Sequence, residues 1–488
     1  TDRPTDAAAP GDPGAPAAGS APAAGSAPAT GSAPATGSAL RPPAPDAADL
    51  GRRRFFRQFA GDLANTAATM MGAAQALQRT SAELAGAILD PARAALEETE
   101  IGRRDAAGLV EEAAGPVFRT SFRFDGDAIR FVDQRALPRA VTEHVARSAA
   151  EVSWAVRNGI VIGGPAIGQA AGLGLALTAA KVRGSRPYAR RATLRGAANA
   201  LINSAPTLGS LRDAVRRVIA AYEAIGELDE DGDAIAAAML AAAERVVADA
   251  TADHGRLIET GLTVIESLPR PTDGPLRLLV HGPAGTLAGG QAGTALAIAI
   301  AAHHAEREVR VVVPEGRPGL AGARVSCWEL AAAGVPYVLI ADAAAPSTIA
   351  AGDVDAILVT ADRVAANGDV AAALGTYGIA VAAIRQGVPL LACAPASAID
   401  PAIASGAEVV IGVRPAGELD HIGDLAIAPR GSEAKVTLHD ITPGELVTSF
   451  VTADGLRTPP FTAGEATPST VQPPPGPTTP LPVADGPA

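Results

Sequence analysis

Short runs of β-branched residues alternate with alanine-rich stretches throughout the second half of the sequence, and this alternation restricts the fold more than any other feature. Each run is apolar at consecutive positions, which is typical of a strand buried on both faces of a sheet. Strands and helices that alternate at this spacing form right-handed crossover units and an open, doubly wound sheet. The runs are LRLLVH ending at His281, VRVVVP ending at Pro314, VPYVLIAD ending at Asp342, DAILVTAD ending at Asp362, VPLLACAP ending at Pro395 and AEVVIG ending at Gly412.

Residues that follow two of these runs have the chemistry of a binding site, because ligands of doubly wound sheets bind beyond the carboxyl ends of the strands. The first run leads into a glycine-rich segment, HGPAGTLAGGQAGTAL, whose helix start could receive an anion. The fourth run ends in Asp362, with Asn367, Gly368 and Asp369 in a tight turn after it. An acidic residue at a strand end is either a proton-transfer group or a helix cap, and position alone leaves both readings open.

Both ends of the chain have compositions that do not build a packed core. Residues 19–39 repeat a six-residue unit, GSAPAA and then GSAPAT, without large apolar side chains, so we expect a disordered tether over residues 1–45. The segment 459–488 is rich in proline and threonine, and we expect a second disordered tail there.

After the tether, apolar residues recur at three- and four-residue spacing and predict an added amphipathic helix within residues 46–118. Its apolar stripe packs either on the globular part of this chain, on a second copy, or on another protein that docks along residues 46–90. The stripe consists of Phe56, Phe59, Leu63, Met70, Ala74, Leu77, Leu84 and Ile88.

Charge and cysteine content narrow the partners and the compartment. A net charge of −12 argues against nucleic acid, which needs a basic surface. With only Cys327 and Cys393, the chain has neither a disulfide framework nor a cysteine-rich zinc site, so we expect a cytoplasmic location. The histidines show no metal-ligand spacing, and we expect neither a metal nor a cofactor. The longest uncharged run, 159–180, is interrupted by glycine and proline, which favours a packed helix over a membrane span.

Seven segments match, in order, the motifs of one known family. Through them, residues 120–456 resemble the methylthioribose-1-phosphate isomerases, the aldose–ketose isomerases of methionine salvage, and the related initiation factor 2B subunits. The resemblance implies a smaller N-terminal α+β domain over 119–270, a Rossmann-like, mostly parallel sheet domain over 271–458, and a homodimer. The segments are IRFVDQRALP, GGPAIGQAAGLGLAL, SRPYA, HGPAGTLAGGQAGTAL, GRPGLAGARVSCWEL, TADRVAANGDVAAALGTYGIAV and HDITPGELVTSFVTADG.

The resemblance assigns roles to individual residues. It implies that Asp362 transfers a proton between adjacent carbons of a ring-opened sugar, which favours proton transfer over capping. It also implies that sugar or sugar phosphate is bound by Arg186 in SRPYA, by the backbone at Gly163 and Gly164, and by the turn at residues 367–369.

Other positions depart from the family pattern. The family's catalytic cysteine corresponds to Gly282, which we still expect to line the substrate site. Three of the family's phosphate contacts correspond to Ile162, Ala321 and Ala373, so phosphosugar binding should be weaker. His281 is the substitute base by position, or else a histidine bonded into the core.

Three functions therefore stay open. The chain is an isomerase of methylthioribose-1-phosphate type, a non-catalytic homologue that binds a metabolite or a protein, or an isomerase-fold enzyme for a less charged sugar or nucleoside-like substrate. Its two cysteines are expected to be inert packing residues in each case.

Overall fold

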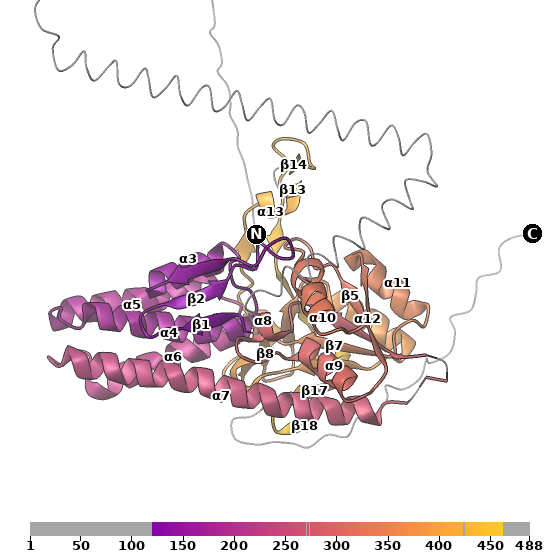
Figure 1. The fold of residues 1–488 in the computed structure, drawn as a ribbon, viewed down its shortest axis with the longest axis horizontal. Helices are drawn as coiled ribbons and strands as arrows, with labels where there is room; N and C mark the ends of the chain where they lie inside the picture. The colour runs from indigo at the N-terminus through magenta and orange to yellow at the C-terminus, as the bar shows by residue number, and fades with distance from the viewer. Residues whose placement is uncertain (1–119, 270, 273, 423–424, 462–488) are drawn as a thin grey trace, which may run out of the picture. The chain divides into compact units, whose positions relative to one another are not determined.

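The computed structural model describes residues 120–461, with the exception of 270, 273 and 423–424 (Figure 1). The predicted tether at 1–45 and the predicted amphipathic helix within 46–118 lie outside the described residues, as does the tail from residue 462 onward. None of the described helices is long and apolar enough to cross a membrane.

The N-terminal part begins with a small antiparallel sheet and continues as five helices. The sheet has the order β1-β2-β3, with β1 (Phe122–Phe124), β2 (Ile129–Val132) and β3 (Glu143–Ala146). The helices are α3 (Ala149–Arg157), α4 (Gly164–Val182), α5 (Pro187–Ser204), α6 (Gly209–Ile225) and α7 (Gly232–Ser267). The N-terminal part thus combines one small sheet with a group of helices.

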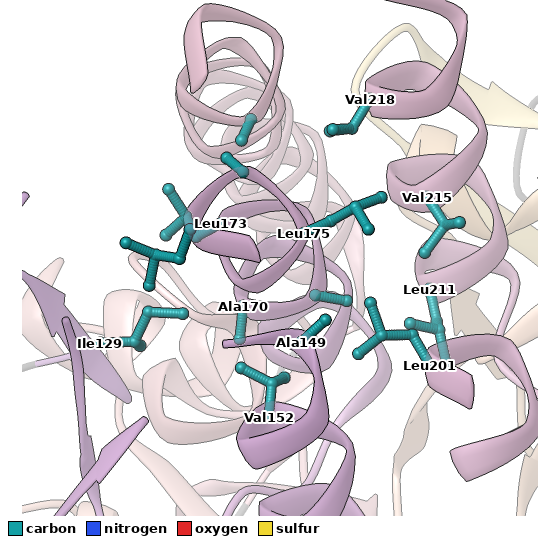
Figure 2. Close-up of a cluster of buried hydrophobic side chains, with 14 of the residues drawn as sticks. Ile129, Ala149, Val152, Ala170, Leu173, Leu175, Leu201, Leu211, Val215 and Val218 are labelled. Carbon is teal, nitrogen blue, oxygen red and sulfur yellow. The ribbon is translucent and has the colours of Figure 1, made fainter. Parts of the chain in front are cut away.

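Helix α4 is the centre of this part, and it is buried from Gly164 to Ala179. Its small residues let the neighbouring helices approach closely. A Cβ at Gly174 would lie 2.7 Å from Val152 on α3, whereas one at Gly172 would lie 3.6 Å from Val218 on α6. Figure 2 shows the resulting core, in which Leu173 and Leu175 of α4 lie among side chains of β2, α3, α5 and α6. The uncharged run is thus a packed helix, as predicted.

Helix α7 takes part in two hydrophobic cores. Its first half contributes Ile235 and Met239 to the core around α4, and its second half contributes Leu257 and Ile265 to the core of the large sheet. Figure 1 shows α7 running from the helical part to the strands. One continuous helix therefore connects the helical part to the sheet.

The large sheet has seven strands in the order β18-β17-β10-β7-β4-β5-β6. All neighbours are parallel except β17 and β18. The order reverses between β4 and β7, which is the doubly wound pattern. The predicted Rossmann-like fold is therefore confirmed. The strands are β4 (Leu276–His281), β5 (Val309–Pro314), β6 (Tyr337–Ile340), β7 (Ala356–Thr360), β10 (Leu390–Cys393), β17 (Ser449–Thr452) and β18 (Gly455–Arg457).

Helices cover both faces of this sheet. Side chains of α7, α9 (Ala295–His304) and α10 (Cys327–Ala332) pack on one face. Side chains of α11 (Ala345–Ala350) and α12 (Thr376–Gln386) pack on the other.

Beyond the end of β7 lies a second sheet in the order β11-β8-β9-β16. Its strands are β11 (Ile399–Asp400), β8 (Arg363–Ala365), β9 (Val370–Ala373) and β16 (His439–Thr442). The remaining elements are short: α8 (Thr286–Gly289), α13 (Gly417–Asp420), a π-helical turn at Gly322–Ser326, 3₁₀ turns at Asp342–Ala344, Ala396–Ala398, Gly406–Glu408 and Gly444–Leu446, and the pairs β12 (Val413–Arg414) with β15 (Val436–Thr437) and β13 (His421–Ile422) with β14 (Leu425–Ala426).

Two strand predictions are corrected by the structure. The run AEVVIG does not form a strand of the large sheet. Its first two residues belong to the 3₁₀ turn that ends at Glu408, and Val410 after them is 57% exposed. The place next to β10 is taken by β17 instead. Strand β6 is not buried on both faces, because it is the sheet edge, with Tyr337 and Leu339 exposed.

The packed region also continues past residue 458, where the tail was expected to begin. Phe461 is 1% exposed, and its ring meets Phe450 of β17 edge to face with centroids 4.8 Å apart. Its amide donates to the carbonyl of Ala366 over 2.8 Å. A buried aromatic ring thus fixes the chain here despite the proline-rich sequence around it.

Candidate functional site

The candidate site lies at the switch point between β4 and β7, because doubly wound sheets bind their ligands beyond the carboxyl ends of the strands at this point. Asp362 follows β7 and is fixed by its own backbone. Its carbonyl accepts from the Gly209 amide over 2.9 Å, and its amide donates to the Ala371 carbonyl over 2.9 Å. The backbone of Asp362 is therefore held in place by the start of α6 on one side and by β9 on the other.

The side chain of Asp362 faces the start of helix α4. A Cβ added to Gly164 would lie 2.9 Å from Oδ1 of Asp362, so only glycine permits this approach. Gly163 before it has φ 89°, and a side chain there would overlap Ala288 of α8. The structure thus places Gly164 against Asp362 and the preceding Gly163 against Ala288. A helix start carries partial positive charge and favours an anion at this position.

The other carboxylate oxygen of Asp362 meets a histidine that sequence reasoning did not place here. Nε2 of His439 lies 3.3 Å from Oδ2 of Asp362, and the two side chains are 16% and 13% exposed. His439 begins β16, which pairs antiparallel with β9 so that His439 lies opposite Ala373. The sequence signals were the strand-forming segment HDIT and the family motif that it begins, but its pairing partner β9 is remote in the sequence.

Gly282 lies at the end of β4 with φ 84°. A Cβ at this position would lie 2.8 Å from Cβ of Ala373. Gly282 and Ala373 are therefore in close contact, and any side chain at residue 282 would be strained both by its backbone angle and by this methyl group.

His281 is buried, with 2% of its surface exposed. Its Nε2 lies 3.0 Å from the carbonyl oxygen of Leu374, so Nε2 carries the proton and donates it. Burial lowers the pKa of His281, against the opposing effects of this bond and of nearby Asp342 and Asp440. Of the two interpretations of His281 given by the sequence, these contacts favour a neutral histidine that is hydrogen-bonded within the core. Its proposed role as a base is left without an exposed nitrogen.

Asp440, next to His439, caps helix α12. Its carboxylate accepts from the amides of Gly375 over 2.8 Å and Tyr377 over 3.3 Å. Burial raises the pKa of Asp440, although these amides and the nearby histidines 281 and 439 act in the opposite direction. This cap anchors the strand that carries His439.

The glycine-rich loop after β4 already binds a carboxyl group of the protein itself. The amide of Leu287, in the first turn of α8, donates to Oε1 of Glu329 over 3.0 Å. A Cβ at Gly285 would overlap the Glu329 carboxylate. Burial raises the pKa of Glu329 to about 7, against the effect of the backbone amides. The predicted anion position at this helix start is therefore filled by a side chain.

The three positions that correspond to phosphate contacts of the family carry uncharged side chains. Ile162 is half-buried and packs against an apolar cluster formed by Val132, Leu137, Leu287 and Val325, together with Trp328. Ala321 precedes the π-helical turn, and Ala373 faces Gly282.

Four predicted binding residues lie away from Asp362. Arg186 is exposed at the start of α5, so the 19-residue helix α4 separates it from Gly164 by about 27 Å. Asn367, Gly368 and Asp369 form the turn of the β8–β9 hairpin, about 10 Å from Asp362 along β8. The Asp369 carboxylate accepts from the amides of Gly406 and Gly444 over 2.9 and 3.0 Å, a structural task.

Both cysteines are buried in the sheet core. Burial raises the pKa of Cys327 to about 11 and that of Cys393 further still. Within residues 120–461, apart from the four gaps, no group of three or more histidine, cysteine, aspartate or glutamate side chains is arranged to hold a metal ion.

Comparisons with known proteins identify the family of this chain. The model of the initiation factor 2 subunit family matches residues 161–459. The methylthioribose-1-phosphate isomerase of Chloroflexus aurantiacus is 40% identical over 340 residues, which are 70% of this chain and 95% of that protein. The enzyme of the same name from a Synechococcus strain is 38% identical over 341 residues, again 70% and 95%.

Two solved structures are similar over the same part of the chain. The 5-methylthioribose 1-phosphate isomerase from Pyrococcus horikoshii superimposes with a TM-score of 0.59 and 33% identity, covering 70% of this chain and 93% of that one. The delta subunit of translation initiation factor eIF-2B from A. fulgidus gives a TM-score of 0.56 and 29% identity, covering 70% and 96%.

Proposed function

Because this chain belongs to the initiation factor 2 subunit family, we propose that it interconverts the aldose and ketose forms of a ribose derivative. Relatives named methylthioribose-1-phosphate isomerase supply the reaction class and the sugar. The observation that carries the proposal is the carboxylate of Asp362, held at the switch point of the sheet against the start of α4. An ionised carboxylate there is placed to take a proton from a sugar carbon.

The proposed enzyme works without a thiol at the end of β4. Gly282 stands at the position that resembles the family's catalytic cysteine, and its φ of 84° and its contact with Ala373 suit glycine. The two cysteines that the chain does have are buried and unreactive. Proton transfer therefore has to come from oxygen and nitrogen groups.

The proposed substrate is less charged than a sugar phosphate at the end that meets Ile162. The Ile162 side chain packs against an apolar cluster, and the other two positions that correspond to phosphate contacts, Ala321 and Ala373, carry no charge either. Each lost charge-assisted contact removes about 1.5 to 3 kcal/mol of binding. Methylthioribose without its phosphate, or a nucleoside-like pentose derivative, suits these uncharged side chains better than the phosphorylated sugar does.

Turnover measurements with paired sugars test this proposal. Methylthioribose and its 1-phosphate are offered separately to the full chain, and conversion is followed by NMR. The parent chain should convert the unphosphorylated sugar with the higher kcat/KM, and Asp362→Asn should lose at least about 100-fold in kcat. Asp213→Asn, a change in an exposed ion pair on α6, serves as the control. Equal turnover by parent and Asp362→Asn would refute the proposal.

A non-catalytic sugar-binding role is the second candidate, and the contact between Gly282 and Ala373 favours it because the end of β4 carries no reactive side chain. Calorimetry separates the two: sugar binding without conversion by the parent chain supports this alternative. A cytoplasmic homodimer remains part of the proposal. The predicted protein partner along residues 46–90 concerns a segment outside the described residues.

A further inference from the structure

The proposed reaction needs a second proton-transfer group besides Asp362. The identification of that group rests on the proposed function. Aldose–ketose conversion by proton transfer needs two groups that act on adjacent carbons and their oxygens. His281 donates to the Leu374 carbonyl, and Glu329 is bound by the first turn of α8. The geometry points to His439 as the proton-transfer residue that acts together with Asp362.

Strand pairing carries His439 to this position. Residues directly opposite each other in an antiparallel pair project from the same face, and His439 lies opposite Ala373. The methyl group of Ala373 faces Gly282. The imidazole therefore projects on the same side of the strands as the Ala373 methyl group that meets Gly282, with Nε2 3.3 Å from Asp362.

The partial exposure of both side chains fits a proton-transfer pair. At 16% and 13%, His439 and Asp362 are shielded from bulk water, yet neither is sealed in the core as His281 is. Oδ2 of Asp362 faces His439, whereas Oδ1 faces the start of α4 and has no hydrogen-bond partner among the described side chains. One oxygen is thus left to act on a sugar carbon.

The reaction balances with these two groups alone. The Asp362 carboxylate removes the proton from C2 of the ring-opened aldose, while the imidazolium of His439 gives a proton to O1, which forms an enediol. Protonated Asp362 then returns a proton to C1, and neutral His439 removes the proton from O2. The ketose forms and both side chains regain their starting charges, without an electron acceptor or another reactant.

Several titratable groups surround His439. Asp362 faces it from the end of β7, Asp440 adjoins it on β16, and His281 lies near Asp440 at the end of β4. From α12, which packs against β16, the backbone amide of Tyr377 binds Asp440. Histidine is the side chain that ordinarily titrates between pH 5 and 8, so its removal should alter the pH profile in that range.

The test compares two histidine–aspartate pairs of the same chain. His439→Gln removes the titrating ring at the site, and His421→Gln removes the exposed ring whose Nδ1 lies 2.6 Å from Asp420. We expect His439→Gln to lower kcat by about 100-fold and to lose one limb of the kcat–pH profile. Sugar affinity by calorimetry should change less than about threefold, and His421→Gln should match the parent chain. A loss of sugar affinity equal to the loss of kcat would instead show a purely structural role.

The outcomes separate this inference from the proposed function. If the parent chain turns over and His439→Gln keeps kcat within threefold with an unchanged pH profile, only the role of His439 is overturned. If the parent chain converts none of the sugars, the proposed function and this inference both fall. A second variant, His439→Asn, guards against a folding artefact, because it must reproduce the loss of the pH limb with an unchanged unfolding midpoint.

Discussion

A Cβ placed on Gly282 lies 2.8 Å from Cβ of Ala373, at a backbone φ of 84°. The end of β4 and the end of β9 therefore meet with no room for a side chain between them. This contact governs what can be introduced at the position that resembles the family's thiol.

Gly282→Cys is accordingly expected to destabilise the fold by about 2 kcal/mol, because it combines an unfavourable backbone conformation with a steric overlap. Urea unfolding measures the loss. Gly334→Ala is the matched control, since Gly334 has a similar φ of 70° but open space around it, and should lose about 1 kcal/mol. Gly282→Cys combined with Ala373→Gly should recover the difference. A fully stable Gly282→Cys would contradict the close contact.

Gly164→Ala should reduce activity while leaving stability nearly unchanged. The added Cβ would lie 2.9 Å from Oδ1 of Asp362, so the carboxylate must move. Alanine otherwise suits a helix better than glycine does, which offsets the strain. We expect kcat to fall by at least about tenfold, because small displacements of a reacting group are costly. Gly172→Ala in the same helix meets its neighbours only at 3.6 Å and should keep full activity.

Glu329→Gln should change how stability depends on pH. Burial raises the pKa of Glu329 to about 7, above its ordinary value of 4.5. Between these values the folded protein holds a proton that the unfolded chain has released, so this group's contribution falls as pH rises from 4.5 to 7. Relative to Glu329→Gln, the parent chain should lose on the order of 3 kcal/mol of unfolding free energy over that window. Urea titrations at several pH values check this, and parallel pH curves for the two proteins would contradict it.

We propose that the exposed face of α12 forms the interface of the homodimer expected from the sequence. Tyr377, Val381 and Ile384 recur at helical spacing and are 49%, 44% and 41% exposed, and Leu374 extends the stripe. Val381→Glu with Ile384→Glu should convert a dimer into a monomer in light scattering. Val413→Glu, at a more exposed valine outside α12, should have no such effect. A dimer that survives the double change would show that another face is used.

The sheet was predictable wherever local sequence decides it. The runs LRLLVH and VRVVVP match β4 and β5 residue for residue, because continuous β-branched stretches suit strands buried on both faces. AEVVIG has the same local composition, yet β17, which contains two polar residues, takes the place beside β10. Only tertiary pairing distinguishes these two segments.

The site was predictable by the same rule. Asp362 follows a recognisable strand, so its place at the switch point could be expected from the sequence. The position of His439 could not be expected, because it depends on the pairing of β16 with β9. The distance of Arg186 from Asp362 follows from the length of α4, which the motif SRPYA does not show. The motif that contains Asp369 also does not show that the carboxylate of this residue accepts hydrogen bonds from the backbone amides of Gly406 and Gly444.

The most direct measurement of the central claim is NMR of methylthioribose with the full chain in D₂O. Proton transfer through Asp362 and His439 predicts formation of the ketose with solvent deuterium at C1, and Asp362→Asn should abolish both conversion and labelling. Sugar that binds but is never converted, or ketose that forms equally fast with Asp362→Asn, would contradict the account.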